Sequence, residues 1–314
     1  MRLPLTFLRL EKHHVKLANE GKGMAVKKRQ KSLSQGRPPT SKPKERMTSQ
    51  RSRTIIRTHH RLHKEYASAV RKGDTKLAAS IAKAIEENGG LEVYQAASKQ
   101  GQSKDRGGDS SKVLIDWLQG AHVLDRTKRT VIEDAAKSIL RCLEVGALST
   151  NNEISKYPKN IEMTRIDLNS QEMGIEKQDF MKRPLPASES DRFDIISLSL
   201  VLNYVPDPAQ RGAMLKRVTQ FLRHNDPSQK IDASVLPALF LVLPLPCVEN
   251  SRYLNERVLL RIMTNLGFSL MNEKKTPKLC YYLFTLTGAS NSTKIEKKKV
   301  RDGPAMNNFC VIVE

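Results

Sequence analysis

The stretch that decides the fold reads Cys142-Leu143-Glu144-Val145-Gly146-Ala147-Leu148-Ser149. It is a short apolar run that stops at a glycine, and short apolar runs bounded in this way are typical of buried strands. An acid followed two residues later by glycine indicates a tight turn where the strand ends, at the edge along which doubly wound sheets bind ligands. Gly146 would let a ligand approach the backbone closely, although glycine here is also ordinary turn chemistry.

Working outward from this strand, apolar runs alternate with stretches of helical periodicity. We expect strands within residues 139–148, 160–168, 192–205, 235–248, 278–287 and 308–313. Apolar residues at helical spacing predict helices over 207–223 and 255–266. Strands that alternate with helices predict an α/β fold, a Rossmann-like, doubly wound and mostly parallel sheet covered on both faces. The last pair, 279–287 and 309–313, is expected to form an antiparallel hairpin at the edge.

The chain before this sheet divides into two parts of different composition. Residues 1–50 are predicted to be a disordered basic tail, because the segment is strongly basic and residues 35–44 are rich in Pro, Ser, Gly and Lys, with too little apolar content to bury a core. Residues 51–134 are predicted to be a helical extension, and short helices at 112–124 and 131–138 are predicted to lead into the sheet domain. The α/β domain over 135–290 and a basic C-terminal segment with a possible edge strand over 291–314 complete the expected organisation.

The positive charge is concentrated at the start of the chain. The first 72 residues contain 20 Lys and Arg against four Asp and Glu, so they hold +16 of the formal net charge of +21. An unfolded cationic segment attracts polyanions through counterion release, whatever their sequence. The cluster Lys27-Lys28-Arg29-Gln30-Lys31 also suits nuclear import, and a solubilising role stays open.

Several classes of protein are excluded by simple patterns. No apolar run reaches the ~20 residues needed to span a bilayer, so we expect no membrane partner. The four cysteines are far apart and lack metal-ligand spacing, so neither a disulfide framework nor a metal site is predicted.

The second predicted strand adds a candidate for nucleoside binding. It ends at Asp167, 21 residues after Gly146. An acid at the end of the next strand, about 20 residues on, accepts hydrogen bonds from ribose hydroxyls. A solvated Asp at a strand end is the alternative. The turn after Gly146 lacks the other glycines of a dinucleotide site, and S-adenosylmethionine tolerates that loss because it has no phosphate.

Two later strand ends provide candidates for the adenine of the cofactor and for a target base. Asp179 and Phe180 follow the expected third strand and place an acid and an aromatic near the cofactor's adenine. Asn203 and Tyr204 end the fourth strand, where they could hold and stack a target base. Tyr204 could equally be an aromatic lid on the core.

These motifs resemble a known family. Residues 144–148, 166–169, 179–180 and 193–206 look like the motifs of class I S-adenosylmethionine-dependent methyltransferases. More narrowly, the chain resembles the fungal nucleolar methyltransferases that modify N1 of an adenine in large-subunit (25S) ribosomal RNA. Supporting stretches are residues 52–57, 90–98, 243–253 and 281–284, and the likeness covers about residues 51 to 288.

The resemblance implies a seven-stranded methyltransferase sheet in which Gly146 and Asp167 bind S-adenosylmethionine. Glu144, Asp179 and Phe180 are the further candidates for cofactor binding, and we expect Asn203 and Tyr204 to position and stack the adenine in a catalytic role. It also implies pre-60S large-subunit RNA as partner, with nuclear and nucleolar localisation and an import receptor as a further partner. The first motif departs from the family pattern in having a single glycine.

The sequence leaves three other interpretations open. Animal relatives of the family are non-catalytic S-adenosylmethionine sensors, and a ribosome-assembly factor with an inactive methyltransferase fold is a second alternative. A nicotinamide dehydrogenase is the third, and the missing glycines disfavour it. A sensor would need neither a base pocket nor an RNA-binding arm, so the +16 segment favours the RNA enzyme. His59, His60 and His63 lie in the basic region, where phosphate contact or surface exposure is expected. Arg252 could bind an anion or brace its loop.

Overall fold

The computed structural model describes residues 47–101, 108–124, 139–170, 172–224, 235–288, 291 and 293–314. Nearly all of the predicted disordered tail, the basic cluster at 27–31 and the predicted helix at 131–138 lie outside these residues. From Met47 to Glu314 the chain is one compact unit.

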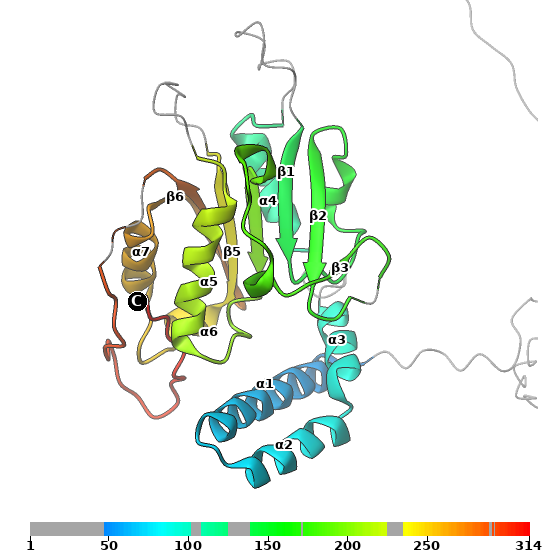
Figure 1. The fold of residues 1–314 in the computed structure, drawn as a ribbon, viewed down its shortest axis with the longest axis vertical. Helices are drawn as coiled ribbons and strands as arrows, with labels where there is room; N and C mark the ends of the chain where they lie inside the picture. The colour runs from blue at the N-terminus through cyan, green and yellow to red at the C-terminus, as the bar shows by residue number, and fades with distance from the viewer. Residues whose placement is uncertain are drawn as a thin grey trace, which may run out of the picture. The chain divides into compact units, whose positions relative to one another are not determined.

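A seven-stranded sheet lies at the centre of this unit, in the order β3-β2-β1-β4-β5-β7-β6 (Figure 1). Its strands are β1 (Leu140–Val145), β2 (Ile161–Asp167), β3 (Glu176–Lys177), β4 (Ile195–Ser199), β5 (Ala238–Pro244), β6 (Phe268–Lys275) and β7 (Leu279–Leu286). Neighbours from β3 to β5 pair in parallel, and β7 runs antiparallel to both β5 and β6. The predicted mostly parallel, doubly wound fold is confirmed.

Each face of the sheet has its own apolar core. Helices α5 (Pro208–Phe221) and α7 (Glu256–Asn265) cover one face, with buried side chains such as Leu215 and Ile262. Helix α4 (Ser111–Gly120) packs Leu114 and Leu118 on the other face. Burial on both faces explains why β5 is a continuous apolar run, as is usual for a central strand of a parallel sheet.

The edge hairpin forms with a strand that the sequence prediction missed. Strand β7 pairs with β6, whereas residues 309–313 do not join the sheet, so the predicted partner was wrong. Strand β6 reads Phe-Ser-Leu-Met-Asn-Glu-Lys-Lys and is exposed over its second half, so it has no apolar run to mark it. Charged residues on an edge strand protect it from pairing with other chains.

The apolar residues 309–313 are instead part of an irregular C-terminal segment, residues 303–314, which we call the C-terminal strap. Phe309, Cys310, Val311 and Val313 are buried, and Val313 makes an isolated bridge with Ile295. Arg211 on α5 is also buried and donates from Nε to the Val205 carbonyl, 2.8 Å away, and from Nη1 to the Cys310 carbonyl. The strap therefore packs on α5, and one arginine links it to the loop after β4.

Three helices precede α4: α1 (Ser49–Arg71), α2 (Thr75–Glu87) and α3 (Gly90–Gly101). Thr48 and Asp74 cap the first two, each accepting a hydrogen bond from a backbone N–H of the first turn. These helices lie within the predicted helical extension, of which residues 102–107 and 125–134 are outside the described residues, and α1 takes in the last two residues of the predicted tail. Short helical segments connect the later strands: η3 (Glu153–Lys156), η4 (Phe180–Lys182), η5 (Glu189–Asp191) and α6 (Leu245–Glu249).

Candidate functional site

The order of the strands reverses between β1 and β4, which lie side by side although other strands separate them in the sequence. In open α/β sheets the ligand binds outside the carboxyl ends of the strands at this switch point. A small pocket lies there, lined by Asp109, Ser110, Glu144, Val145, Gly146, Leu148, Ser149, Asn152 and Ser199. Two predicted site residues, Glu144 and Gly146, are therefore found at the switch point.

Gly146 occupies a backbone conformation that favours glycine. Its φ is +76°, in the left-handed region, and a Cβ added there would lie 2.6 Å from Cγ2 of Val201. Its N–H donates to the Ile166 carbonyl at 2.8 Å, which fixes the turn against β2. Glycine here thus allows close approach between the β1 turn and the loop after β4.

Asp167 is the last residue of β2 and lies in a polar cluster. Its Oδ1 accepts a hydrogen bond from the Asn169 N–H at 2.8 Å and a longer one, 3.4 Å, from Nε2 of Gln95 on α3. Burial raises the pKa of Asp167, against the opposing effects of the Asn169 N–H and the Lys99 charge. Neither hydrogen bond uses Oδ2, the second oxygen of the carboxylate.

Glu144 lines the pocket, but protein groups already engage its carboxylate. Both oxygens accept from Nδ2 of Asn152 at 3.0 Å, and Oε2 lies 3.3 Å from Nε of Arg165. Burial raises the pKa of Glu144 to about 7, despite the lowering effects of Asn152 and Arg165. Glu144 therefore forms a largely buried ion pair with Arg165 in the wall of the pocket.

The residues predicted after the third strand lie apart from the switch-point pocket. Asp179 caps η4 by accepting from the Met181 N–H at 2.8 Å. The Phe180 ring is 3% exposed and packs on Phe221, with ring centroids 5.3 Å apart. The ring thus belongs to the core, which leaves it no exposed face on which an adenine could stack.

Asn203 and Tyr204 lie in the loop after β4, as predicted, and their surroundings differ. Oδ1 of Asn203 is a buried atom without a hydrogen-bond partner in the described part of the chain. A buried unpartnered acceptor is costly and needs an explanation, such as a ligand that completes it. The Tyr204 ring is covered by His60, at 4.0 Å between centroids, and by Tyr94, at 5.5 Å.

Two histidines of α1, His59 and His60, pack in an aromatic cluster, contrary to the expectation of surface exposure. His59 stacks on Tyr94 with centroids 4.3 Å apart, and His60 packs on Tyr204. Burial, joined by nearby positive charges, lowers the pKa of His59 to about 4 and that of His60 to about 3. Both rings are therefore neutral at pH 7 and do not add positive charge for phosphate; His63 is exposed.

Arg252 braces its loop, one of the two predicted possibilities. It donates to the carbonyls of Met306 and Gly303 at 2.6 and 2.7 Å and to Oδ1 of Asn308 at 2.9 Å. These bonds hold the C-terminal strap and saturate most of the guanidinium group.

Two pocket residues that the sequence analysis missed, Asp109 and Ser110, come from just before α4. Asp109 accepts from the Ser111 N–H at 2.8 Å, and Ser110 lies 2.7 Å from Ser199, oxygen to oxygen. An Asp-Ser-Ser run before an apolar helix does signal a helix start. Nothing in that local signal indicates that the helix start lies against β1 and β4.

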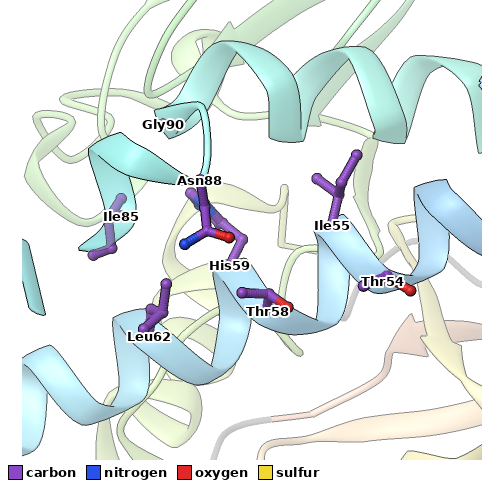
Figure 2. Close-up of a pocket in the computed structure, with 8 residues that line it drawn as sticks. All are labelled: Thr54, Ile55, Thr58, His59, Leu62, Ile85, Asn88 and Gly90. Carbon is purple, nitrogen blue, oxygen red and sulfur yellow. The ribbon is translucent and has the colours of Figure 1, made fainter. Parts of the chain in front are cut away.

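A second pocket, of about 70 Å³, lies among the N-terminal helices (Figure 2). Its lining comes from α1 and the α2–α3 turn: Thr54, Ile55, Thr58, His59, Leu62, Ile85, Asn88 and Gly90. None of these residues is at the carboxyl edge of the sheet. Within the described residues, no group of three or more potential metal ligands occurs, and no helix is apolar enough over sufficient length to cross a membrane.

The strand order and the site at its switch point define a Rossmann-like α/β protein of the class I methyltransferase type. Residues 79–311 match the family described as 25S rRNA (adenine(2142)-N(1))-methyltransferase, Bmt2. The chain belongs to this family.

Two curated relatives agree with the family match. A 25S rRNA (adenine(2142)-N(1))-methyltransferase of Saccharomyces cerevisiae is 40% identical over 227 residues, which cover 72% of this chain and 60% of that protein. A 25S rRNA adenine-N(1) methyltransferase of Schizosaccharomyces pombe is 35% identical over 258 residues, or 82% and 89% of the two chains. Among solved structures, a Burkholderia thailandensis 1,6-didemethyltoxoflavin-N1-methyltransferase has 11% identity and a TM-score of 0.36, over 57% of this chain and 84% of that one.

Proposed function

We propose that this protein is an S-adenosylmethionine-dependent methyltransferase that methylates N1 of an adenine in 25S ribosomal RNA. Membership of the family supports the reaction and the substrate. The observation in the structure that carries the proposal is the unpartnered, buried Oδ1 of Asn203 in the loop after β4. This acceptor lies on the same loop as Val201, which approaches Gly146 at the switch point.

The residues at the edge fit S-adenosylmethionine. Asp167 has one oxygen outside its two hydrogen bonds and stands where an acid accepts from ribose hydroxyls. Gly146 has no Cβ and turns the backbone sharply at the pocket. The cofactor supplies an electrophilic methyl group on sulfur and has no phosphate, so a single glycine in the turn suffices.

Asn203 suits an adenine because the base carries a donor beside its reacting atom. The exocyclic amine of adenine neighbours N1 on the Watson–Crick edge. An N–H of that amine would satisfy the Asn203 Oδ1 and fix the orientation of N1 in the pocket. The same edge is paired in a duplex, so the target adenine must be unpaired or flipped to reach the site.

Methylation at N1 requires positioning more than acid–base chemistry. The in-plane lone pair of N1 forms the new N–C bond, and the product base becomes cationic without releasing a proton at that step. No side chain is needed to remove a proton from N1. Orientation and exclusion of water are therefore expected to dominate the rate enhancement.

We further propose that the protein acts in the nucleus and nucleolus on pre-60S RNA, as part of ribosome biogenesis. The substrate of the family supports this assignment, together with the cluster at 27–31, which suits an import receptor. Fluorescence imaging of the tagged chain, with and without the four basic residues of the cluster changed to Gln, tests the location. Unchanged nuclear signal in the variant would refute the role of the cluster.

The proposed activity separates into two testable parts, cofactor binding and methyl transfer. We would titrate S-adenosylmethionine calorimetrically and measure tritium-methyl transfer to unmodified large-subunit RNA for each variant. Asp167→Ala should lose binding and transfer, whereas Asn203→Ala should keep binding and lose most transfer. The exposed Asp116→Ala and Asn151→Ala serve as matched controls and should resemble the wild type.

The modified position can be read independently, because a methyl group on N1 blocks Watson–Crick pairing and stops reverse transcription. Binding of the cofactor without transfer to any RNA would refute the enzyme and support the non-catalytic sensor or assembly factor. Failure of the wild type to bind the cofactor would refute the cofactor site itself.

A further inference from the structure

Helix α1 is strongly basic and lies against the loop that we assign to base positioning. Among its 23 residues are six Lys or Arg and a single acid, Glu65, which pairs with Arg61 at 3.0 Å. His60 contacts the Tyr204 ring, and Arg71 forms an ion pair with Asp207, the N-cap of α5. These two contacts, made by residues eleven positions apart, define the face of α1 that packs against the segment between β4 and α5.

Two further arginines lie on that same face. At 100° per residue, Arg53, Arg57, His60 and Arg71 fall within about 60° of one another around the helix. At 1.5 Å per residue, Arg57 and Arg53 lie about 4.5 and 10.5 Å from His60 along the axis, toward the helix N-terminus. The face that touches the Tyr204 loop therefore continues into an exposed arginine pair, Arg53 and Arg57.

The arginine pair is not neutralised by the described part of the chain. Arg53 makes one long hydrogen bond, 3.4 Å, to the Ser49 hydroxyl, and no carboxylate there pairs with either guanidinium. The pKa values of His59 and His60 are lowered, so the positive charge of this face comes from arginine and lysine at pH 7. Exposed guanidinium groups without acidic partners are suited to oxyanions, which they bind with two parallel hydrogen bonds.

We propose that the arginine pair binds backbone phosphates of the RNA substrate and holds the strand beside the Asn203–Tyr204 loop. This inference rests on the proposed function, since it assigns to that reaction the surface on which the RNA lies. A strand held by its phosphates on α1 presents its bases to the adjoining edge of the sheet, where Asn203 has its unpartnered acceptor. The basic residues before α1 would add affinity along the same strand, without fixing its register.

The carboxylate of S-adenosylmethionine is the other anion that the arginine pair could bind. The two ligands are distinguished by whether removing the arginines weakens the affinity for RNA or the affinity for the cofactor. The test uses the full chain with Arg53→Gln/Arg57→Gln, which removes both charges and retains residues of good helix propensity. The matched control is Arg257→Gln/Arg261→Gln, an exposed pair with the same spacing on α7, which covers one face of the sheet. Far-UV circular dichroism and the thermal midpoint verify that each variant is folded.

RNA binding is measured by fluorescence anisotropy on a single-stranded 25S fragment at several salt concentrations, with the cofactor affinity measured in parallel. Each lost phosphate contact on a single strand lowers the slope of log K against log salt by ~0.7, so the slope should fall by ~1.4. At 0.1 M salt this corresponds to binding weaker by about 25-fold. Arg53→Lys/Arg57→Lys should restore most of the slope, because lysine binds phosphate as a point charge.

Three results would overturn the proposal: an unchanged salt slope in the Gln pair, an equal loss in the α7 control, or weaker cofactor binding with unchanged RNA binding. The last would assign the arginines to the cofactor carboxylate. Wild-type protein that binds RNA without methylating it would refute the proposed function and leave the salt-slope test intact. Methylation by the wild type together with an unchanged slope would refute this inference alone.

Discussion

Replacing Gly212 with alanine should have two opposing effects on stability: it raises the helix propensity of α5, and it places a Cβ against the backbone of Ile312. Gly212 lies inside helix α5, where alanine is favoured over glycine by about 1 kcal/mol of helix propensity. Considered as an isolated helix, α5 should therefore be stabilised by Gly212→Ala. The structure predicts the opposite sign.

The added Cβ would lie 1.8 Å from the carbonyl oxygen of Ile312 and 2.7 Å from its carbonyl carbon. These are backbone atoms and cannot rotate away, so the C-terminal strap must move back by about 1.5 Å to reach ordinary contact. That movement disrupts three hydrogen bonds: Ile312 N–H to Pro208, and the reciprocal pair between Val313 and Ile295. At about 1 kcal/mol each they outweigh the helix gain, so we expect a net loss of about 2 kcal/mol.

The assay is urea unfolding followed by circular dichroism, with the wild type alongside. Ala213→Gly, at the next and exposed position of α5, isolates helix propensity and should cost about 1 kcal/mol. Removal of residues 312–314 should cost less stability in the Gly212→Ala chain than in the wild type, because the clash has already displaced them. A Gly212→Ala protein more stable than the wild type by about 1 kcal/mol would refute the reasoning, since it would mean that the strap does not pack on α5.

Two other predictions concern the site. Gly146→Ala should lower the free energy of unfolding by about 2 kcal/mol and weaken cofactor binding, because a φ of +76° costs a residue with a Cβ about 1–2 kcal/mol and the added Cβ meets Val201. In urea unfolding, the double variant Gly146→Ala/Val201→Ala should recover only the part of the loss that comes from the clash with Val201. If the double variant recovers no stability, the clash is excluded as a cause. Burial, then the charges of neighbouring Lys and His residues, lowers the pKa of His60 from 6.5 to about 3. Its contribution to stability is therefore complete above about pH 6.5 and declines as the pH falls toward 3. Thermal unfolding from pH 7 to 4.5 should show this decline in the wild type and less of it in His60→Phe; an equal decline would assign it to another group.

Much of the central sheet could be predicted from local sequence. Strands β1, β4 and β5 are largely buried on both faces, and the resulting apolar runs stand out from the polar loops. The places of Gly146 and Asp167 at the ends of β1 and β2 could be predicted from spacing, because they are set by strand length and by the crossover between the two strands. The sequence also predicted the helical extension, whose first two helices carry polar caps.

Other parts depended on contacts between distant segments. Residues 309–313 have the composition of a strand, but their hydrogen-bonding and packing partners are on α5 and at Ile295, and the polar strand β6 occupies the sheet edge instead. Phe180 reads as a base-stacking aromatic, yet Phe221 of α5 covers it.

The sequence by itself determined the α/β class, the basic start of the chain and the position of the turn at Gly146, because these depend on residue type and on spacing within one strand or crossover. The tertiary structure decided which face each side chain meets: it made His60 a neutral contact of Tyr204, engaged Glu144 with Arg165, and left the Asn203 acceptor without a partner. Burial and hydrogen bonding are properties of neighbours in space, and those neighbours lie up to 144 residues apart along the chain, as for His60 and Tyr204. Local periodicity contains no information about such pairs.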